Sequence, residues 1–161
     1  MWMKSDGEGD TVAIAMNGQQ TVITDHHGEG QEKKYTFDYS FWSHDGYKTE
    51  DSGYLAVDGP ASKYHDQKFV YDKIGVDVLD NAWQGFHTCL FAYGQTGSGK
   101  SYSMTGYGAN KGIIPQACQE IYRRIDENSD PDISFEVETQ VCEIYNEVVQ
   151  DLCIDPRKRK Q

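Results

Sequence analysis

The chain has 161 residues, of which 37% are hydrophobic and 12% aromatic, a composition that suits a packed domain and argues against a disordered, solvated chain. Its 15 lysines and arginines stand against 26 aspartates and glutamates, so the net charge of −11 argues against binding of nucleic acid or of an anionic membrane. The sequence opens with no signal-peptide pattern and contains no apolar run of membrane-spanning length, so the cytosol is the expected compartment.

Strand patterns dominate the first part of the chain. After a polar, glycine-rich segment at 1–10, two short strands are predicted at 11–16 and 21–25, with Asn17-Gly18 at the turn between them. The alternation of Tyr35, Phe37 and Tyr39 within 34–42 predicts a third strand with an aromatic face.

A long polar stretch and then a helix are predicted next. Residues 43–65 are unusually long for a connection within a domain, so we interpret them as a surface excursion of the kind that often carries function. Asp66 has the character of a helix N-cap, and Gly85 is the predicted stop. The spacing of apolar residues between them predicts an amphipathic helix whose buried face contains Val70, Ile74, Val78, Leu79, Ala82 and Trp83.

Residues 94–101, GQTGSGKS, match the phosphate-binding pattern G-x-x-x-x-G-K-[ST], and the apolar run 87–93 before them has the length of a buried strand. Glycines let backbone N–H groups turn toward phosphate oxygens, and the N-terminus of the following helix adds partial positive charge. Lys100 would reach the β and γ phosphates, and the Ser101 hydroxyl would bind a Mg²⁺ ion that bridges them. A glycine-rich turn that binds nothing is the alternative.

After this loop a second helix is predicted over 112–128, with Pro115 near its first turn, and a further strand over 133–145. The succession of strand, helix, strand with phosphate loop, helix and strand predicts an α/β fold. We therefore expect a largely parallel sheet with helices on both faces.

The four cysteines lie too far apart for the paired C-x-x-C motifs of zinc or redox sites. We expect them to be reduced and mostly buried thiols, at Cys89, Cys118, Cys142 and Cys153.

Three blocks of sequence together resemble the motor domain of the kinesin superfamily: FAYGQTGSGKSYSM at 91–104, GIIP at 112–115 and EIYNEVVQDL at 143–152. FDYSFWSH at 37–44 resembles the vesicle-transport class in particular. The resemblance implies a P-loop NTPase of the kinesin-motor type, with a mostly parallel sheet flanked by helices. Residues 11–155 would be an incomplete motor domain, its nucleotide-binding N-terminal half.

The resemblance also implies a site for ATP or ADP with Mg²⁺. Eight residues are similar to the family's phosphate-binding loop: Gly94, Gln95, Thr96, Gly97, Ser98, Gly99, Lys100 and Ser101. Ser101 would be the metal ligand. Tyr102 would pack against the adenine ring, with ordinary core packing as the alternative. For Lys100 the alternative is a solvated surface lysine.

The family is a group of microtubule-stimulated ATPases, so the resemblance implies ATP-driven movement along microtubules, in the cytoplasm on the cytoskeleton, for the complete protein. The family's Arg-x-Arg-Pro stretch and its two switch motifs, Asn-x-x-Ser-Ser-Arg and Asp-x-x-Gly-Ser-Glu, do not occur in these 161 residues. Phosphoryl transfer requires a positioned water, so the loop alone does not predict turnover. The alternative is a non-motor, kinesin-derived protein that binds a nucleotide, a microtubule or a partner structurally.

The chain ends in a basic tail, residues 156–161, with Arg157, Lys158, Arg159 and Lys160 in succession. The resemblance suggests the start of a loop that contacts the acidic microtubule. A solvated tail is the alternative.

Overall fold

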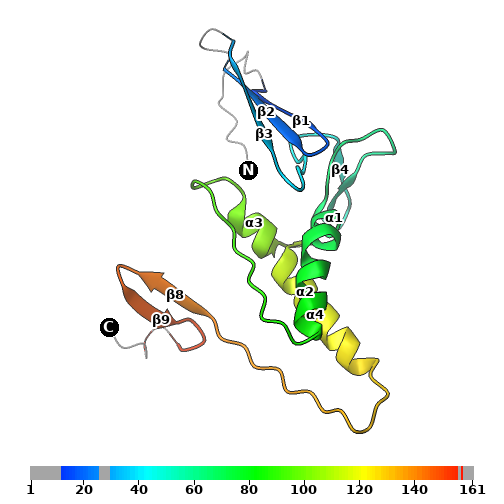
Figure 1. Ribbon diagram of the computed structural model, residues 1–161, viewed down its shortest axis with the longest axis vertical. Helices are drawn as coiled ribbons and strands as arrows, with labels where there is room; N and C mark the ends of the chain where they lie inside the picture. Colours follow the sequence, from blue (N-terminus) through cyan, green and yellow to red (C-terminus); the bar gives the residue numbers. More distant parts are fainter. Residues whose placement is uncertain (1–11, 26–29, 156, 158–161) are drawn as a thin grey trace. The chain divides into compact units, whose positions relative to one another are not determined.

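The computed structural model describes residues 12–25, 30–155 and 157. The predicted segment 1–10 and most of the predicted basic tail lie outside the described residues. The chain divides into two compact units, Met1–Arg123 and Arg124–Gln161, and each is treated separately (Figure 1).

The first unit begins with a three-stranded antiparallel sheet formed by β1 (Ile14–Asn17), β2 (Gln20–Thr24) and β3 (Glu32–Thr36). Gly18 adopts a φ of 58° in the turn between β1 and β2, where a residue with a side chain would be strained, so the predicted hairpin is confirmed. The third strand is shorter than predicted because the chain leaves the sheet after Thr36. The aromatic residues beyond it stack on each other, with the rings of Tyr39 and Phe41 5.8 Å apart.

The polar stretch 43–65 carries a small antiparallel hairpin of β4 (Tyr47–Thr49) and β5 (Leu55–Val57). Most of its residues are exposed, as predicted, but Tyr64 is 5% exposed. The Tyr64 ring lies 5.2 Å from the ring of Tyr47, so aromatic contacts hold the two ends of this stretch together.

The predicted helix after Asp66 forms, and the Asp66 carboxylate accepts a hydrogen bond of 2.7 Å from the Phe69 backbone N–H. The helix runs through α1 (Gln67–Val70), a π-helical turn η1 (Tyr71–Gly75) and α2 (Val76–Trp83). Gly85, with a φ of 91°, follows its end as expected.

The buried row of this helix matches the predicted one only in part: Leu79 is buried as predicted, and Val70, Ile74 and Val78 are half-buried. Tyr71, Gly75 and Leu79 are buried, whereas Trp83, which we expected on the apolar face, is exposed. A β-carbon on Gly75 would lie 2.3 Å from the Tyr71 ring, so that ring packs directly against the glycine. The π turn changes the spacing between successive turns and moves the contact to a neighbouring row of residues.

The first unit continues with α3 (Lys100–Met104) and a short hairpin of β6 (Gly106–Tyr107) and β7 (Asn110–Lys111). α4 (Ile113–Asp126) then forms where the second helix was predicted, with Pro115 in its first turn. Its last residues belong to the second unit.

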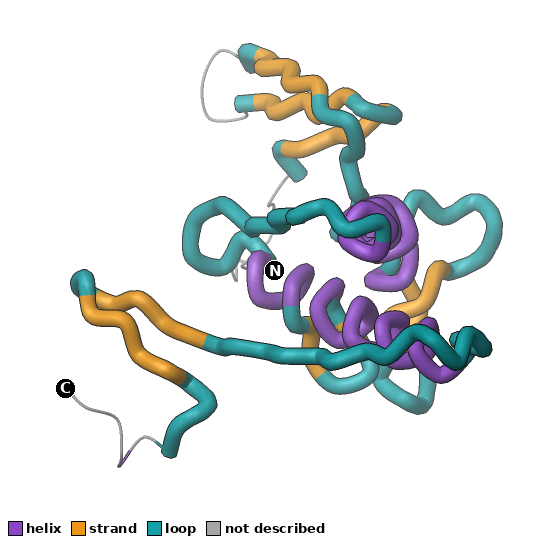
Figure 2. The backbone as a smooth tube through the Cα atoms, turned by 60° about the horizontal axis from the view of Figure 1, so that its bottom comes forward, coloured by secondary structure: helices purple, strands orange, loops and turns teal. Residues whose placement is uncertain are grey.

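In the second unit, β8 (Cys142–Tyr145) and β9 (Val148–Asp151) pair as an antiparallel hairpin. The turn between them places Asn146 and Glu147 at φ values of 48° and 60°. The predicted strand over 133–145 forms only in its last four residues, those of β8. Figure 2 shows the preceding residues as a continuous loop segment after the end of α4.

The predicted strand 87–93 also has no ladder, and every strand pair among the described residues is antiparallel. A strand is stabilised by hydrogen bonds to a neighbour, and the apolar pattern of a sequence does not supply that neighbour. Phe91 and Tyr93 are accordingly 80% and 94% exposed. The largely parallel sheet that we expected is therefore not formed by the described residues.

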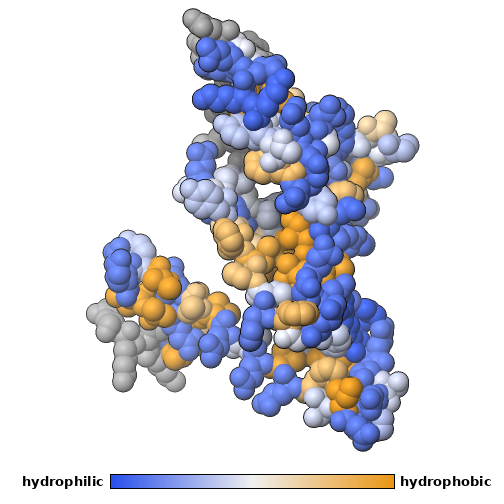
Figure 3. All heavy atoms as spheres, viewed as in Figure 1, coloured by the Kyte–Doolittle hydropathy of each residue, from blue (hydrophilic) through white to orange (hydrophobic). Residues whose placement is uncertain are grey.

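The expectation of buried cysteines is wrong, because all four thiols are free and exposed, at Cys89, Cys118, Cys142 and Cys153. Cys89 lies in segment 87–93, which pairs with no strand among the described residues. Cys142 lies on β8, and Cys153 lies two residues after β9. Cys118 lies on an exposed side of α4. Figure 3 shows hydrophobic surface over both units, including the β8–β9 hairpin. Among the described helices, none combines the length and the apolar character needed to cross a membrane.

Candidate functional site

The glycine-rich loop at 94–99 is a tight turn that leads directly into α3. Three of its residues have positive φ values, which are 149° at Gly94, 81° at Gly97 and 94° at Gly99. A β-carbon on Gly94 would lie 2.5 Å from the Ser98 hydroxyl oxygen, so this position has no room for a side chain. The loop closes through a hydrogen bond of 3.2 Å from the Ser98 N–H to the Gln95 carbonyl oxygen. Glycine is therefore required by the backbone at these positions.

Lys100, the first residue of α3, folds back over this loop. Its ammonium group donates hydrogen bonds of 2.7 Å each to the carbonyl oxygens of Gly94 and Gln95. Within the described part of the chain, the positive charge is thus held beside the turn by two neutral carbonyl acceptors and no carboxylate. A lysine in this arrangement can exchange a carbonyl contact for an anionic oxygen, which is the stronger acceptor.

The remaining predicted loop residues lie around the same turn. Gly99 is the N-cap of α3, and no side chain caps it. The side chains that the sequence assigned to phosphates or to Mg²⁺ are solvent-exposed, at Gln95, Thr96, Ser98 and Ser101. The structure therefore brings together all nine predicted residues, from Gly94 to Tyr102, in one turn and one short helix.

Tyr102 is half-buried, and its ring lies 6.2 Å from that of Tyr107. Burial raises the pKa of the Tyr102 hydroxyl, while the neighbouring Tyr64 hydroxyl acts in the opposite direction. This environment agrees with the core-packing alternative for Tyr102. Its role toward an adenine ring stays a prediction.

Behind α3, the tyrosine hydroxyls gather near Asp66. Burial and a hydrogen bond to the Asp66 carboxylate raise the pKa of Tyr54 to about 12. The pKa of Tyr64 is raised further, by burial first and then by Tyr102. The raised pKa values keep these hydroxyls neutral at physiological pH.

A cluster of amide side chains, which we did not predict, joins the segments around α3. Gln67 donates from Nε2 to the Tyr102 carbonyl oxygen at 2.5 Å and to the Asn110 carbonyl oxygen at 3.4 Å. Asn110 in turn accepts a hydrogen bond from Leu55 N–H at 2.8 Å and donates to the Gly53 carbonyl oxygen at 2.9 Å. A buried amide has no periodic signal in a sequence, so only the structure could reveal this cluster.

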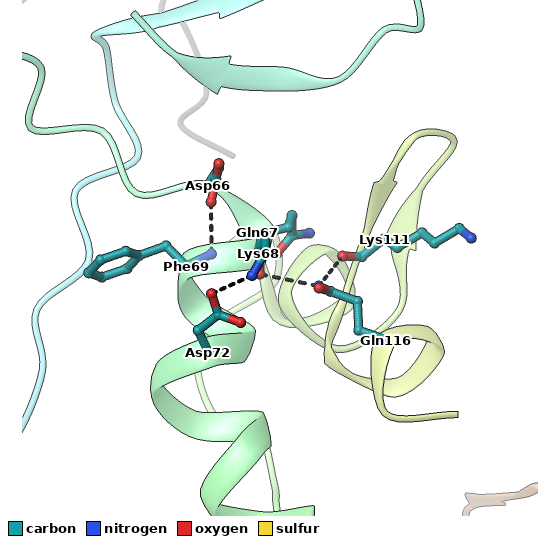
Figure 4. Close-up of polar contacts among 7 residues, drawn as sticks. All are labelled: Asp66, Gln67, Lys68, Phe69, Asp72, Lys111 and Gln116. Carbon is teal, nitrogen blue, oxygen red and sulfur yellow. Dashed lines mark hydrogen bonds and ion pairs between the residues drawn. The ribbon is translucent and has the colours of Figure 1, made fainter. Parts of the chain in front are cut away.

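Gln116, on the first turns of α4, extends the cluster. Its Nε2 donates to the carbonyl oxygens of Lys111 at 2.8 Å and Gln67 at 3.2 Å, as Figure 4 shows. The same view shows Asp66 bonded to the Phe69 N–H and Lys68 paired with Asp72 at 2.6 Å. α1, β7 and α4 are thus connected through hydrogen bonds that end on backbone carbonyls.

A glycine turn that runs into a helix beginning Lys-Ser, with the lysine folded over the turn, defines the class of P-loop proteins. The family model described as the kinesin motor domain matches residues 3–161, and the chain belongs to this family. The expected fold class, a P-loop fold of the kinesin type, is confirmed by this match and by the structural comparisons.

Kinesin-like protein KIF28 of Mus musculus is 43% identical over 152 residues, which are 92% of this chain and 14% of that protein. Kinesin-like protein unc-104 of Caenorhabditis elegans is 39% identical over 142 residues, 86% of this chain and 8% of that protein. These relatives are broadly consistent with the vesicle-transport class indicated by residues 37–44. The chain thus spans a small part of the curated relatives that it matches.

A solved structure of a KIF14 dimer, in a two-heads-bound state with AMP-PNP and in complex with a microtubule, matches with a TM-score of 0.76 and 34% identity. The match covers 92% of this chain and 38% of that one. A second KIF14 structure, with ADP and in complex with a microtubule, matches with a TM-score of 0.71 and 32% identity, over 94% of this chain and 38% of the other.

Proposed function

We propose that this chain supplies the ATP-binding part of a kinesin-like microtubule motor domain. The observation that carries the proposal is the loop at 94–99, with its three positive-φ glycines and the Lys100 ammonium bonded to its carbonyls. Supporting it, two similar KIF14 structures are described with ADP or AMP-PNP and in complex with a microtubule.

In this proposal the loop holds the phosphates of ATP or ADP. Lys100 moves its hydrogen bonds from the Gly94 and Gln95 carbonyls to phosphate oxygens, which are stronger acceptors because they are charged. The exposed Ser101 hydroxyl is available as a ligand for Mg²⁺, a cation that prefers oxygen ligands. Tyr102 borders the adenine side of the site. The microtubule is the proposed partner, and the cytoskeleton in the cytoplasm is the proposed location.

The donor set fits a polyphosphate better than it fits a neutral ligand. One ammonium group and the exposed Ser101 hydroxyl lie at a turn where the space beside Gly97 is open. A fixed positive charge matters particularly in a chain with a net charge of −11, because the rest of the molecule repels anions. Mg²⁺ would neutralise part of the phosphate charge when bound.

A second candidate function, nucleotide binding without turnover, is favoured by one observation on the sequence. Neither switch motif of the family occurs in these 161 residues, so no group assigned here positions an attacking water. Under this reading the chain acts as a structural nucleotide-binding module. Both candidates require the loop at 94–101 to bind phosphates.

Phosphate binding by the loop at 94–101, which both candidate functions require, is tested by equilibrium binding of a fluorescent ADP analogue with Mg²⁺. The proteins compared are the 161-residue chain and Lys100→Ala. A charge-assisted hydrogen bond contributes about 1.5–3 kcal/mol, so the dissociation constant should rise roughly tenfold or more. The matched control is Lys111→Ala, because Lys111 is an exposed lysine on β7 outside the loop. Equal affinity of all three proteins would contradict the proposal.

A further inference from the structure

Gln67 is a buried amide that connects two elements far apart in the sequence. Its side chain is 5% exposed, yet it is the first residue of α1 and lies one position after the N-cap Asp66. Burying a primary amide is costly unless its donors are satisfied. Here both donors of Nε2 are used, on the carbonyl oxygens of Tyr102 at 2.5 Å and Asn110 at 3.4 Å.

The Tyr102 carbonyl lies in the last turn of α3, whose carbonyls lack partners within the helix. α3 has five residues, ends at Met104, and is followed by Gly106 with a φ of 74°. A helix this short is not stable through its own hydrogen bonds, so contacts from outside determine its position. The Gln67 amide is one such contact, and the Gly112 N–H, which donates to the Thr105 carbonyl oxygen at 3.0 Å, is another.

α3 begins with the residues proposed to bind the nucleotide. Lys100, Ser101 and Tyr102 occupy its first three positions, and the Gln67 contact is made to the third of them. A displacement of the last turn of α3 therefore moves the ammonium and hydroxyl groups at its start. Charge-assisted contacts to phosphates depend on the placement of such groups.

We infer that Gln67 is a positioning residue for nucleotide binding, which holds α3 against α1 through the Tyr102 carbonyl so that Lys100 and Ser101 face the phosphates. This inference rests on the proposed function. It assigns to α1 a role in the nucleotide site although no residue of α1 lies in the loop. The N-cap Asp66 and the hydrogen bond from Gln116 fix the backbone from which Gln67 extends.

The test compares Gln67→Met, which keeps the length of the side chain and removes its donors, with Gln19→Met as the matched control. The Gln19 side chain donates to the Asp38 carbonyl oxygen at 3.0 Å, and both residues lie outside α1 and α3. The first measurement is amide hydrogen exchange of Ser103 and Thr105, whose N–H groups donate to the Gly99 and Ser101 carbonyls at 2.9 Å each. The second is the dissociation constant for the fluorescent ADP analogue with Mg²⁺.

Faster exchange in α3 and a dissociation constant raised roughly 3- to 10-fold in Gln67→Met alone would support the inference. Unchanged exchange, or equal effects of the two variants, would overturn it. If the unmodified chain binds no nucleotide, the proposed function fails. The positioning role is then overturned as well, even if amide exchange in α3 is faster in Gln67→Met. If the chain binds nucleotide and Gln67→Met binds equally well, only the inference fails.

A third variant, Gln67→Glu, covers the case in which Gln67→Met does not fold. An ionised carboxylate faces the Tyr102 carbonyl unfavourably, whereas a protonated carboxyl restores one donor at the same place. Because position 67 is buried, the pKa of the introduced carboxyl should lie well above the roughly 4.3 of a free glutamate. The ratio of its dissociation constant to that of the unmodified chain should therefore fall toward one as the pH is lowered from 7.5 to 5.5. A ratio that does not change with pH would contradict a role for the donor.

Discussion

Trp42 and His65 hold each other through a reciprocal pair of hydrogen bonds. The Trp42 backbone N–H donates to His65 Nδ1 at 3.0 Å, and the His65 backbone N–H donates to the Trp42 carbonyl oxygen at 2.8 Å. The first bond requires an unprotonated Nδ1, so the ring is neutral with its proton on Nε2. The ring also lies 4.4 Å from that of Phe69 in α1.

The stability of the first unit should therefore fall in mild acid. Burial lowers the pKa of His65 below 6.5, and the nearby Asp66 carboxylate opposes this only partly. The folded state therefore binds a proton at His65 less readily than the unfolded state does. The contribution of neutral His65 to the free energy of unfolding is complete above pH 6.5 and is lost as the pH falls below that value. His65→Asn retains an acceptor oxygen without titrating in this range.

The measurement is thermal unfolding of the chain and of His65→Asn between pH 5 and 7.5. We expect the unfolding temperature of the unmodified chain to fall more steeply toward pH 5 than that of the variant. Parallel curves would show that His65 does not contribute to the pH dependence.

Substitution of Gly106 should be far more damaging than substitution of its neighbour Gly108. A β-carbon on Gly106 would lie 1.9 Å from the Asn110 carbonyl oxygen, whereas at Gly108 nothing lies within 4 Å. Both residues have positive φ, which costs a residue with a side chain about 1–2 kcal/mol. Urea unfolding should give a loss of about that size for Gly108→Ala and a clearly larger one for Gly106→Ala. Similar losses would argue against the close packing of β6 on β7.

Local signals in the sequence predicted several elements correctly. Asp66 was predicted to cap a helix, Gly18 to lie at a hairpin turn, and residues 112–128 to form a second helix, and each prediction is confirmed. These features depend on interactions within about five residues, which a sequence displays directly. The spacing of the glycines also predicted a loop at 94–99, and the structure has a tight turn there with Lys100 folded over it. That this loop binds phosphates stays a prediction.

Features that depend on distant partners were predicted poorly. The apolar runs at 87–93 and 133–141 have strand patterns, but no ladder forms there within the described part of the chain. The π turn at Tyr71–Gly75 displaces part of the buried row of the helix formed by α1, η1 and α2. This was not predicted, because nothing in the apolar spacing of the sequence marks such a turn. The cluster around Gln67 and Asn110 was missed because each amide bonds to residues more than 30 positions away.

The cap at Asp66 should contribute measurably to stability. Removing an N-cap carboxylate costs about 1 kcal/mol, so Asp66→Ala should lower the free energy of unfolding by about that amount. Asp72→Ala is the control, because its ion pair with Lys68 is exposed and such a pair contributes about 0.3–0.5 kcal/mol. Denaturant titration of both variants measures the difference. A cost at Asp72 equal to that at Asp66 would be inconsistent with capping.

The 161-residue chain should not hydrolyse ATP in a microtubule-stimulated manner. The loop can hold phosphates, but the sequence lacks the two switch motifs, so no assigned residue positions the attacking water. The assay is phosphate release from Mg-ATP, with and without microtubules, for the chain and for Lys100→Ala. A rate that increases with microtubules and disappears in Lys100→Ala would reveal catalytic groups in this chain and exclude the non-motor reading.

The central claim, that the loop at 94–101 binds phosphates, is tested most directly by an NMR titration of the chain with Mg-ADP, which detects weak binding. The resonances of the Gly94, Gly97 and Gly99 amides should shift with a saturable dependence on nucleotide, together with those of α3. The Gly18 amide, in the turn between β1 and β2, should not shift, and Lys100→Ala should weaken the response. Loop resonances that stay unchanged at saturating nucleotide, or that shift equally in Lys100→Ala, would contradict the claim.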